Sequence, residues 1–293
     1  MPEALFYGSG TALVTPFTAD QVDYGAWRRL VEGQLARGVD ALVVLGSTGE
    51  AATVTPQERG KLISVAVSLA AGRVPVIVSA ASNCTRSAME LAQNARELGA
   101  DGILLSPPWY NRPKPDGIRE HFFRVAEAGG LPVIAYNVPS RTCVNLSAAL
   151  MGELARHPLI RGLKEASSDA AHISEMLAQV GEGIAVYAGN DMNILPIMAQ
   201  GGRGAITVAG NLVPEAMTAL THAMLREDLD SARRVLGRIA PLLMALGREV
   251  NPGPIKQAMS MRGLCEAVMR LPLTPVSEKT CQELEQALAA AGA

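Results

Sequence analysis

Eight short apolar segments alternate with amphipathic segments over the first 220 residues of this chain. Their starting positions are 20 to 34 residues apart, which leaves room for a strand, a loop and a crossover helix in each unit. The apolar segments cover residues 11–17, 41–47, 75–80, 102–107, 132–138, 160–166, 184–189 and 204–209. Strands with such continuous apolar runs are typical of parallel sheets that are buried on both faces.

A closed (β/α)8 TIM barrel accommodates eight such units in this length, and it is the α/β fold that we expect. A doubly wound open sheet is the alternative, but no GxGxxG motif follows the first strand. The alternation stops near Pro214, and helical patterns follow over residues 214–226, 229–247, 254–263 and 277–291. We therefore expect a catalytic barrel over residues 1–224 and a C-terminal helical domain over residues 225–293.

Composition restricts the partners of the chain. A net charge of −2 indicates no nucleic-acid or membrane-surface partner, and no stretch reaches the ~20 apolar residues of a membrane span. The first residues lack the basic and apolar segments of a signal peptide. The four cysteines form no CxxC pair, and the four histidines lack ligand spacing and fit surface or cap positions. We expect reduced thiols, no metal site and a cytoplasmic location.

Lys164 is the one lysine that falls within a predicted strand. The other four, Lys61, Lys114, Lys256 and Lys279, lie in stretches with the pattern of exposed helix or loop. An amine kept out of water is more often neutral, and a neutral amine can attack a ketone to form a Schiff base. The alternative is a structural lysine that pairs with a carboxylate.

Active sites of (β/α)8 barrels lie at the C-terminal ends of the strands, so polar residues there are candidates for chemistry. The second strand ends in the turn Gly46-Ser47-Thr48-Gly49, whose N–H groups can hold a carboxylate, unless it is an ordinary tight turn. Tyr136 lies on the strand next to Lys164 and can move protons at a carbinolamine, unless it is a core tyrosine. Arg141 can clamp a substrate carboxylate, or be a solvated surface arginine.

Five segments of the chain carry a resemblance to a known family. They are residues 46–50, 110–113, 136–142, 162–166 and 251–256, or GSTGE, YNRP, YNVPSRT, GLKEA and NPGPIK. In this order and at barrel spacing they resemble the dihydrodipicolinate synthases, in the N-acetylneuraminate lyase superfamily of pyruvate-dependent class I aldolases. The resemblance covers essentially the whole chain.

The resemblance implies a Schiff-base condensation of pyruvate with L-aspartate 4-semialdehyde that yields 4-hydroxy-tetrahydrodipicolinate, in lysine and diaminopimelate biosynthesis. It implies that Lys164 forms the Schiff base with pyruvate. It also implies a proton relay of Tyr136, Thr48 and Tyr110, in which Tyr110 reaches in from a neighbouring subunit.

The resemblance further implies the substrate-binding residues. Ser47 and Thr48 would hold the pyruvate carboxylate, and Arg141 the carboxylate of aspartate semialdehyde. Ile206 and Gly189 would line the pocket. No cofactor or metal is implied, and the family is usually a homotetramer, a dimer of dimers.

Two other functions compete. One is a related class I aldolase or lyase that acts on a sugar acid or another 2-keto acid, like N-acetylneuraminate lyase. Sialate lyases usually lack an arginine at the position of Arg141, which favours the synthase. The other is a non-catalytic barrel, which would have no need for Lys164 and Tyr136 together.

The resemblance also gives an expectation about feedback. In family members that lysine inhibits, an interface pocket binds the amino acid. Here Ser87 stands where a carboxylate would pair with its ammonium group, and Pro56 and Arg59 replace histidines. We expect weak or no inhibition by lysine, because an unpaired buried ammonium is costly.

Overall fold

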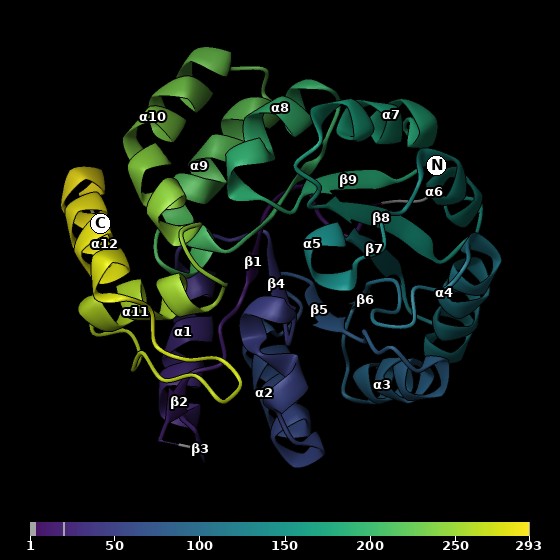
Figure 1. Cartoon of the computed structure of the whole chain (residues 1–293), viewed down its shortest axis with the longest axis horizontal. Coiled ribbons are helices and arrows are strands. Elements are labelled where there is room, and N and C mark those ends of the chain that lie inside the picture. Colours follow the sequence, from purple (N-terminus) through teal and green to yellow (C-terminus); the bar gives the residue numbers. More distant parts are fainter. Residues whose placement is uncertain (1–3, 20, 293) are drawn as a thin grey trace.

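The computed structural model describes residues 4–19 and 21–292, and its main sheet is a closed barrel (Figure 1). Around the barrel the strand order is β1-β10-β9-β8-β7-β6-β5-β4, and the neighbours pair in parallel. The strands are β1 (Gly8–Ala12), β4 (Ala41–Val44), β5 (Val76–Ser79), β6 (Gly102–Leu105), β7 (Val133–Asn137), β8 (Ile160–Glu165), β9 (Ala185–Ala188) and β10 (Gly204–Thr207). The predicted (β/α)8 barrel is confirmed.

The first strand differs from its expected position. It covers Gly8–Ala12 instead of residues 11–17, and the following residues enter a small antiparallel pair, β2 (Phe17–Thr18) and β3 (Gln21–Val22). Its polar residues are buried: the Thr11 hydroxyl donates to Gln34 Oε1 over 2.7 Å, whereas Ser9 Oγ has no partner among the described residues. A glycine- and serine-rich strand lacks the apolar run on which the expectation relied.

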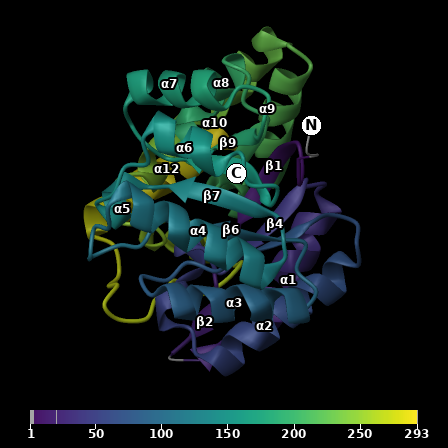
Figure 2. The ribbon, with the colours of Figure 1, turned by 90° about the vertical axis from the view of Figure 1, so that its right-hand side faces the viewer.

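Helices surround the barrel, and Figure 2 shows three of them, α3, α4 and α6, in front of β6 and β7. The surrounding helices are α1 (Tyr24–Ala36), α2 (Pro56–Ala70), α3 (Thr85–Glu97), α4 (Pro115–Gly129), α6 (Ala148–Leu154), α7 (Ala170–Val180), α8 (Ile194–Ala199) and α9 (Pro214–Leu225). Capping residues in the sequence mark where these helices begin and end. Helix α2 begins with a capping box between Thr55 and Glu58, and α7 ends at Gly181 with a φ of +52°.

Strand side chains alternate between two apolar clusters. Val43 packs inside the barrel, whereas its neighbours Leu42 and Val44 pack outside it, against the helices. The inner cluster is small because polar side chains occupy the C-terminal end of the barrel. The candidate residues are among these side chains and therefore share one face of the barrel. One histidine departs from expectation: His121 on α4 is buried, and burial lowers its pKa to about 4.

The C-terminal helices α10 (Leu229–Leu246), α11 (Gly253–Met261) and α12 (Glu278–Ala291) gather along one side of the barrel (Figure 1). Helix α10 packs against both α9 and α12. The proposed domain boundary at residues 224/225 stays a prediction, and Leu225 is the last residue of α9. Over the described residues, no helix is both long and apolar enough to cross a membrane.

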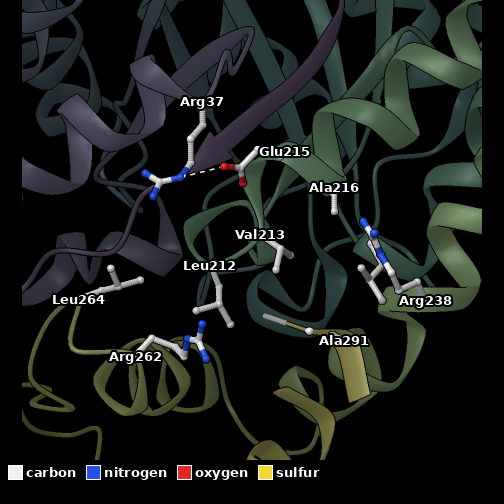
Figure 3. Close-up of a pocket in the computed structure, with 11 residues that line it drawn as sticks. Arg37, Leu212, Val213, Glu215, Ala216, Arg238, Arg262, Leu264 and Ala291 are labelled. Atoms are coloured by element: carbon white, nitrogen blue, oxygen red, sulfur yellow. Dashed lines mark ion pairs between the residues drawn. The ribbon is translucent and has the colours of Figure 1, made fainter. Parts of the chain in front are cut away.

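A cavity of about 380 Å³ lies where these helices meet the barrel (Figure 3). Arg37 forms an ion pair with Glu215 there, with 2.9 Å between Nε and Oε1. Arg238 of α10 and Arg262, which follows α11, also line it. Apolar side chains, among them Leu212 and Ile239, line the cavity together with these charged groups.

Candidate active site

Lys164 lies near the C-terminal end of β8 and is only 4% exposed. Strand alternation turns it into the barrel, because the preceding Leu163 packs in the outer cluster. Tyr136 of β7 is its partner in register, and Lys164 Nζ lies 4.3 Å from the centroid of the Tyr136 ring. The structure thus brings the predicted amine and phenol together in one enclosed place.

On its other side, Lys164 lies next to β9. Gly189, the residue directly after β9, has no room for a side chain. A Cβ on Gly189 would lie 3.1 Å from Lys164 Cε and 3.0 Å from the Glu165 carbonyl oxygen. Tyr187, which pairs with Lys164 in register, stacks on Phe6 at 4.4 Å and donates to its carbonyl oxygen. Gly189 therefore gives the lysine side chain room, whereas Tyr187 fills the barrel interior beside it.

The turn after β4 is a short 3-10 helix, Ser47–Gly49. Its Gly49 N–H donates to the Gly46 carbonyl oxygen over 3.0 Å, and it ends at Glu50 in a left-handed conformation with a φ of +51°. Thr48 is buried and Ser47 is half-buried. The segment is a tight turn at the C-terminal end of a barrel strand, and the binding of a carboxylate by its N–H groups stays a prediction.

Arg141 lies on the short helix α5 (Pro139–Thr142), just past β7, and is exposed. Its Nη2 donates to the Asn251 carbonyl oxygen over 2.9 Å, and Asn251 Nδ2 donates to Thr48 Oγ1 over the same distance. Asn251 thus links Arg141 to Thr48. Asn251 begins one of the five segments that carry the family resemblance, but it was not predicted as a site residue.

Two predicted residues take no part in these hydrogen bonds, although one of them, Ile206, belongs to the same inner cluster as Tyr136. Ile206 is fully buried on β10, in the inner cluster. Tyr110 lies between β6 and α4 with 85% of its surface exposed and a φ of +71°. Within residues 4–19 and 21–292, no hydrogen bond joins Tyr110 to Lys164, Tyr136 or Thr48, so the chain alone does not assemble the predicted relay.

The expectation that Lys256 is exposed is wrong. Lys256 is fully buried on α11, where its Nζ forms an ion pair with Glu50 and donates to the Val268 carbonyl oxygen over 2.8 Å. Burial lowers the pKa of Lys256, against the opposing effect of Glu50. A signal was present in the sequence, because Lys256 lies three residues before the apolar Met259 on the same helical face.

Asp191, in the 3-10 helix that follows β9, is a further residue without an assigned role. The residue is half-buried, but its carboxyl group is enclosed: Oδ2 accepts from the N–H groups of Val208 and Ala209, and Oδ1 has no partner among the described residues. Burial raises the pKa of Asp191, while these hydrogen bonds and the charge of Lys164 oppose the rise.

The described part of the chain holds no group of three or more His, Cys, Asp or Glu side chains that could bind a metal ion, and its four cysteines are free thiols. What the site offers is a buried amine, a phenol in contact with it, a hydroxyl-bearing turn and an exposed guanidinium. Such groups suit imine chemistry on a substrate that carries carboxylates.

Comparison with known proteins agrees with this chemistry. A model of the dihydrodipicolinate synthetase family matches residues 5–291. A 4-hydroxy-tetrahydrodipicolinate synthase of Nitratidesulfovibrio vulgaris is 43% identical over 98% of this chain and 99% of its own. The dihydrodipicolinate synthase of Aquifex aeolicus is 41% identical, with a TM-score of 0.95 and 98% of each chain covered. A dihydrodipicolinate synthase variant described as monomeric is 38% identical, with a TM-score of 0.96 over 98% of this chain and 97% of its own. This chain belongs to the dihydrodipicolinate synthetase family.

Proposed function

We propose that this chain is a lyase, a 4-hydroxy-tetrahydrodipicolinate synthase that condenses pyruvate with L-aspartate 4-semialdehyde. The observation that carries the proposal is the buried amine of Lys164, in contact with Tyr136 and set behind a turn and an arginine that can each bind a carboxylate. Family membership and the close relatives support the same reaction.

In this mechanism Lys164 Nζ attacks the ketone carbon of pyruvate, and loss of water gives the imine. Loss of a methyl proton converts the imine to an enamine, whose carbon attacks the aldehyde of the second substrate. The amino group of that substrate then attacks the imine carbon, which closes the ring and releases Lys164. Each step moves a proton, and Tyr136 and Thr48 are the proposed carriers, with Tyr110 as the link to solvent.

Both substrates carry a carboxylate, and the site offers two places that can bind one. We assign the pyruvate carboxylate to Ser47, Thr48 and the N–H groups of their turn. Arg141 is assigned to the carboxylate of aspartate semialdehyde, because a guanidinium can bind a carboxylate with two hydrogen bonds. Gly189 and Ile206 are assigned to the wall of the pocket. A lyase acting on a sugar acid remains the second candidate, and Arg141 disfavours it.

The test is a panel of aldehydes supplied with pyruvate. We expect turnover with aspartate semialdehyde and little with N-acetylmannosamine or simple aldehydes; the reverse preference would establish the lyase.

Arg141→Ala should raise the KM for aspartate semialdehyde by about 10- to 100-fold and leave the pyruvate KM nearly unchanged, since it loses a charged hydrogen bond of ~1.5–3 kcal/mol. Arg141→Lys is the matched control that keeps the charge. Equal effects on both substrates would contradict the assignment.

We also propose that the enzyme is a homotetramer, a dimer of dimers, and that it works in the cytoplasm. The exposed Tyr110 supports assembly, and the four free thiols fit a reducing compartment. Sedimentation of the purified protein tests the assembly; a monomer that is fully active would overturn it. Fractionation of the source cells tests the location.

A further inference from the structure

Asn251 joins two parts of the proposed active site from outside the barrel. It lies between α10 and α11, in the C-terminal helical region. Its side-chain Nδ2 donates to Thr48 Oγ1, and its backbone carbonyl accepts from Arg141 Nη2, both over 2.9 Å. One residue therefore contacts the proposed pyruvate subsite with its side chain and the proposed semialdehyde subsite with its backbone.

The hydrogen bond between Asn251 and Thr48 has a defined donor and acceptor. A threonine hydroxyl has one proton to donate and two lone pairs to accept with. Because Thr48 Oγ1 accepts from the Asn251 amide, its own proton is not used in that bond. Among the described residues, Thr48 Oγ1 makes no other hydrogen bond, and the residue is only 3% exposed. The proton is therefore free to point into the pocket.

We propose that Asn251 is a positioning residue that fixes the Thr48 hydroxyl as a donor toward the substrate and Tyr136. The proposal rests on the proposed function, in which Thr48 carries protons. Asn251 Oδ1 is buried without a partner among the described residues, so the bond to Thr48 is the one hydrogen bond that the Asn251 side chain makes there. Asn251 acts through Thr48 and touches no reacting atom.

Two substitutions at this position separate the proposal from simple packing. Asn251→Ala removes the donor, leaves the backbone contact to Arg141, and should lower kcat about tenfold with the semialdehyde KM within about twofold. Asn251→Asp keeps the shape but accepts the Thr48 proton, so it should lower kcat further, by about a hundredfold. A packing role predicts the opposite order, because aspartate is the better steric match.

The control for local structure is Arg248→Ala. Arg248 lies three residues away, is exposed, and pairs with Glu283 on α12, so kcat and the melting temperature should stay close to those of the wild type. Thermal unfolding of each variant shows whether it is folded. An Asn251→Asp enzyme that is folded and more active than Asn251→Ala would overturn the proposal.

A double-mutant cycle provides the second readout. If Asn251 acts through Thr48, then adding Asn251→Ala to Thr48→Val should change kcat by less than about twofold. A further tenfold loss in that background would show that Asn251 acts by another route and overturn the proposal. Borohydride trapping of the pyruvate imine on each variant repeats the comparison without the aldehyde. If the wild type does not use aspartate semialdehyde but the variants keep their order of activity in the trapping experiment, the proposed acceptor is wrong and the role of Asn251 stands.

Discussion

Lys164 and Lys256 are both buried lysines, and their surroundings separate two uses of a buried amine. Lys256 has the partners of a structural lysine, the Glu50 carboxylate and a carbonyl oxygen. Lys164 forms no hydrogen bond or ion pair within the described residues and lies over the face of Tyr136. An amine whose N–H groups are not held by a fixed acceptor is available to attack a carbonyl carbon.

This contrast makes Lys164 the expected site of covalent modification by pyruvate. Pyruvate and then borohydride should fix a three-carbon adduct on Lys164, and Lys164→Ala should lose activity by about 10³-fold or more, because covalent catalysis disappears. Lys61→Ala is the matched control, since Lys61 is exposed on α2. Peptide mapping by mass spectrometry locates the adduct. An adduct on Lys256 or Lys61, with Lys164 unmodified, would refute the assignment. Activity should also persist in excess chelator.

Single residues were predictable from sequence where a periodic element fixed their direction. Lys164 and Tyr136 lie on adjacent strands, so alternation and register place them together. Asn251 belongs to no periodic element, and its partners Thr48 and Arg141 lie 203 and 110 positions away along the chain. No local pattern encodes such a contact, because it depends on how the C-terminal helices pack.

At the scale of elements, the buried pair of Glu50 and Lys256 fastens α11 to the turn that follows β4. Both side chains are almost fully enclosed, and Glu50 Oε2 also accepts from the Arg270 N–H over 3.1 Å. Glu50 directly follows the proposed pyruvate-binding turn. The C-terminal helices therefore support the active site as well as covering the barrel.

Lys256→Met should destabilise the protein by about 3–5 kcal/mol, because the Glu50 carboxylate is left buried without its counter-charge. Adding Glu50→Gln should recover part of that loss, since no buried charge is then unpaired. Urea unfolding measures both, and Lys279→Met, at an exposed position of α12, is the control. A Lys256→Met protein as stable as the control would show that the pair is not a structural anchor.

A second ion pair ties α2 to the loop before α12. Arg270 binds both Glu58 carboxylate oxygens, at 2.8 and 2.6 Å, and holds the pKa of Glu58 at about 2, below its usual 4.5. A carboxyl group with a lowered pKa in the folded state stabilises that state above the unfolded pKa and loses the effect as pH falls. The contribution should be complete above pH 4.5 and disappear as pH falls toward 2.

Glu58→Gln should therefore lower the free energy of unfolding at neutral pH, and the difference from the wild type should shrink as pH falls toward 2. Denaturant unfolding across this pH range provides the measurement. Glu32→Gln removes an exposed ion pair with Arg28 on α1 and should have little effect at any pH. A deficit that stays constant down to pH 2 would exclude the ion pair as its cause.

Element positions were predicted well where apolar runs or caps marked them, and poorly where they did not. Seven strands lie within their expected ranges, whereas β1 begins three residues before its expected start because Gly8, Ser9 and Gly10 carry no apolar signal. The four C-terminal helical stretches agree with α9 to α12 within one or two residues. Their packing against the barrel was not predictable, since it depends on contacts such as Glu50 with Lys256.

For the whole molecule, the buried Arg59 bears on regulation. Its side chain is 8% exposed and donates through Nη2 to the Ser79 carbonyl oxygen over 2.6 Å. Burial lowers its pKa to about 10, so it still carries its charge at neutral pH. The family resemblance implies that this charge lies in the pocket that would receive a cationic amino acid, where it would repel the ligand.

We expect weak or no inhibition when lysine is titrated into the condensation assay, because Ser87 cannot neutralise the ammonium and Arg59 adds a like charge. The double substitution Arg59→His and Ser87→Glu should increase the sensitivity to lysine. Ser64→Glu, which adds the same charge at an exposed position of α2, is the control. Half-inhibition of the wild type at submillimolar lysine would show that this interpretation of the pocket is wrong.

Assembly is the last property of the whole molecule, and Tyr110 provides its test. An aromatic side chain that is 85% exposed on a residue with positive φ is poorly explained by the single chain, and we propose that it completes the site of a neighbouring subunit. Tyr110→Phe and Lys164→Ala should each be nearly inactive alone. Co-expressed in equal amounts, they should recover about a quarter of the wild-type sites, since half the dimers are mixed and each has one complete site. Tyr136→Phe with Lys164→Ala should recover nothing, because both residues belong to one subunit. If the first pair also fails to recover activity although mixed dimers form, Tyr110 does not act across the interface.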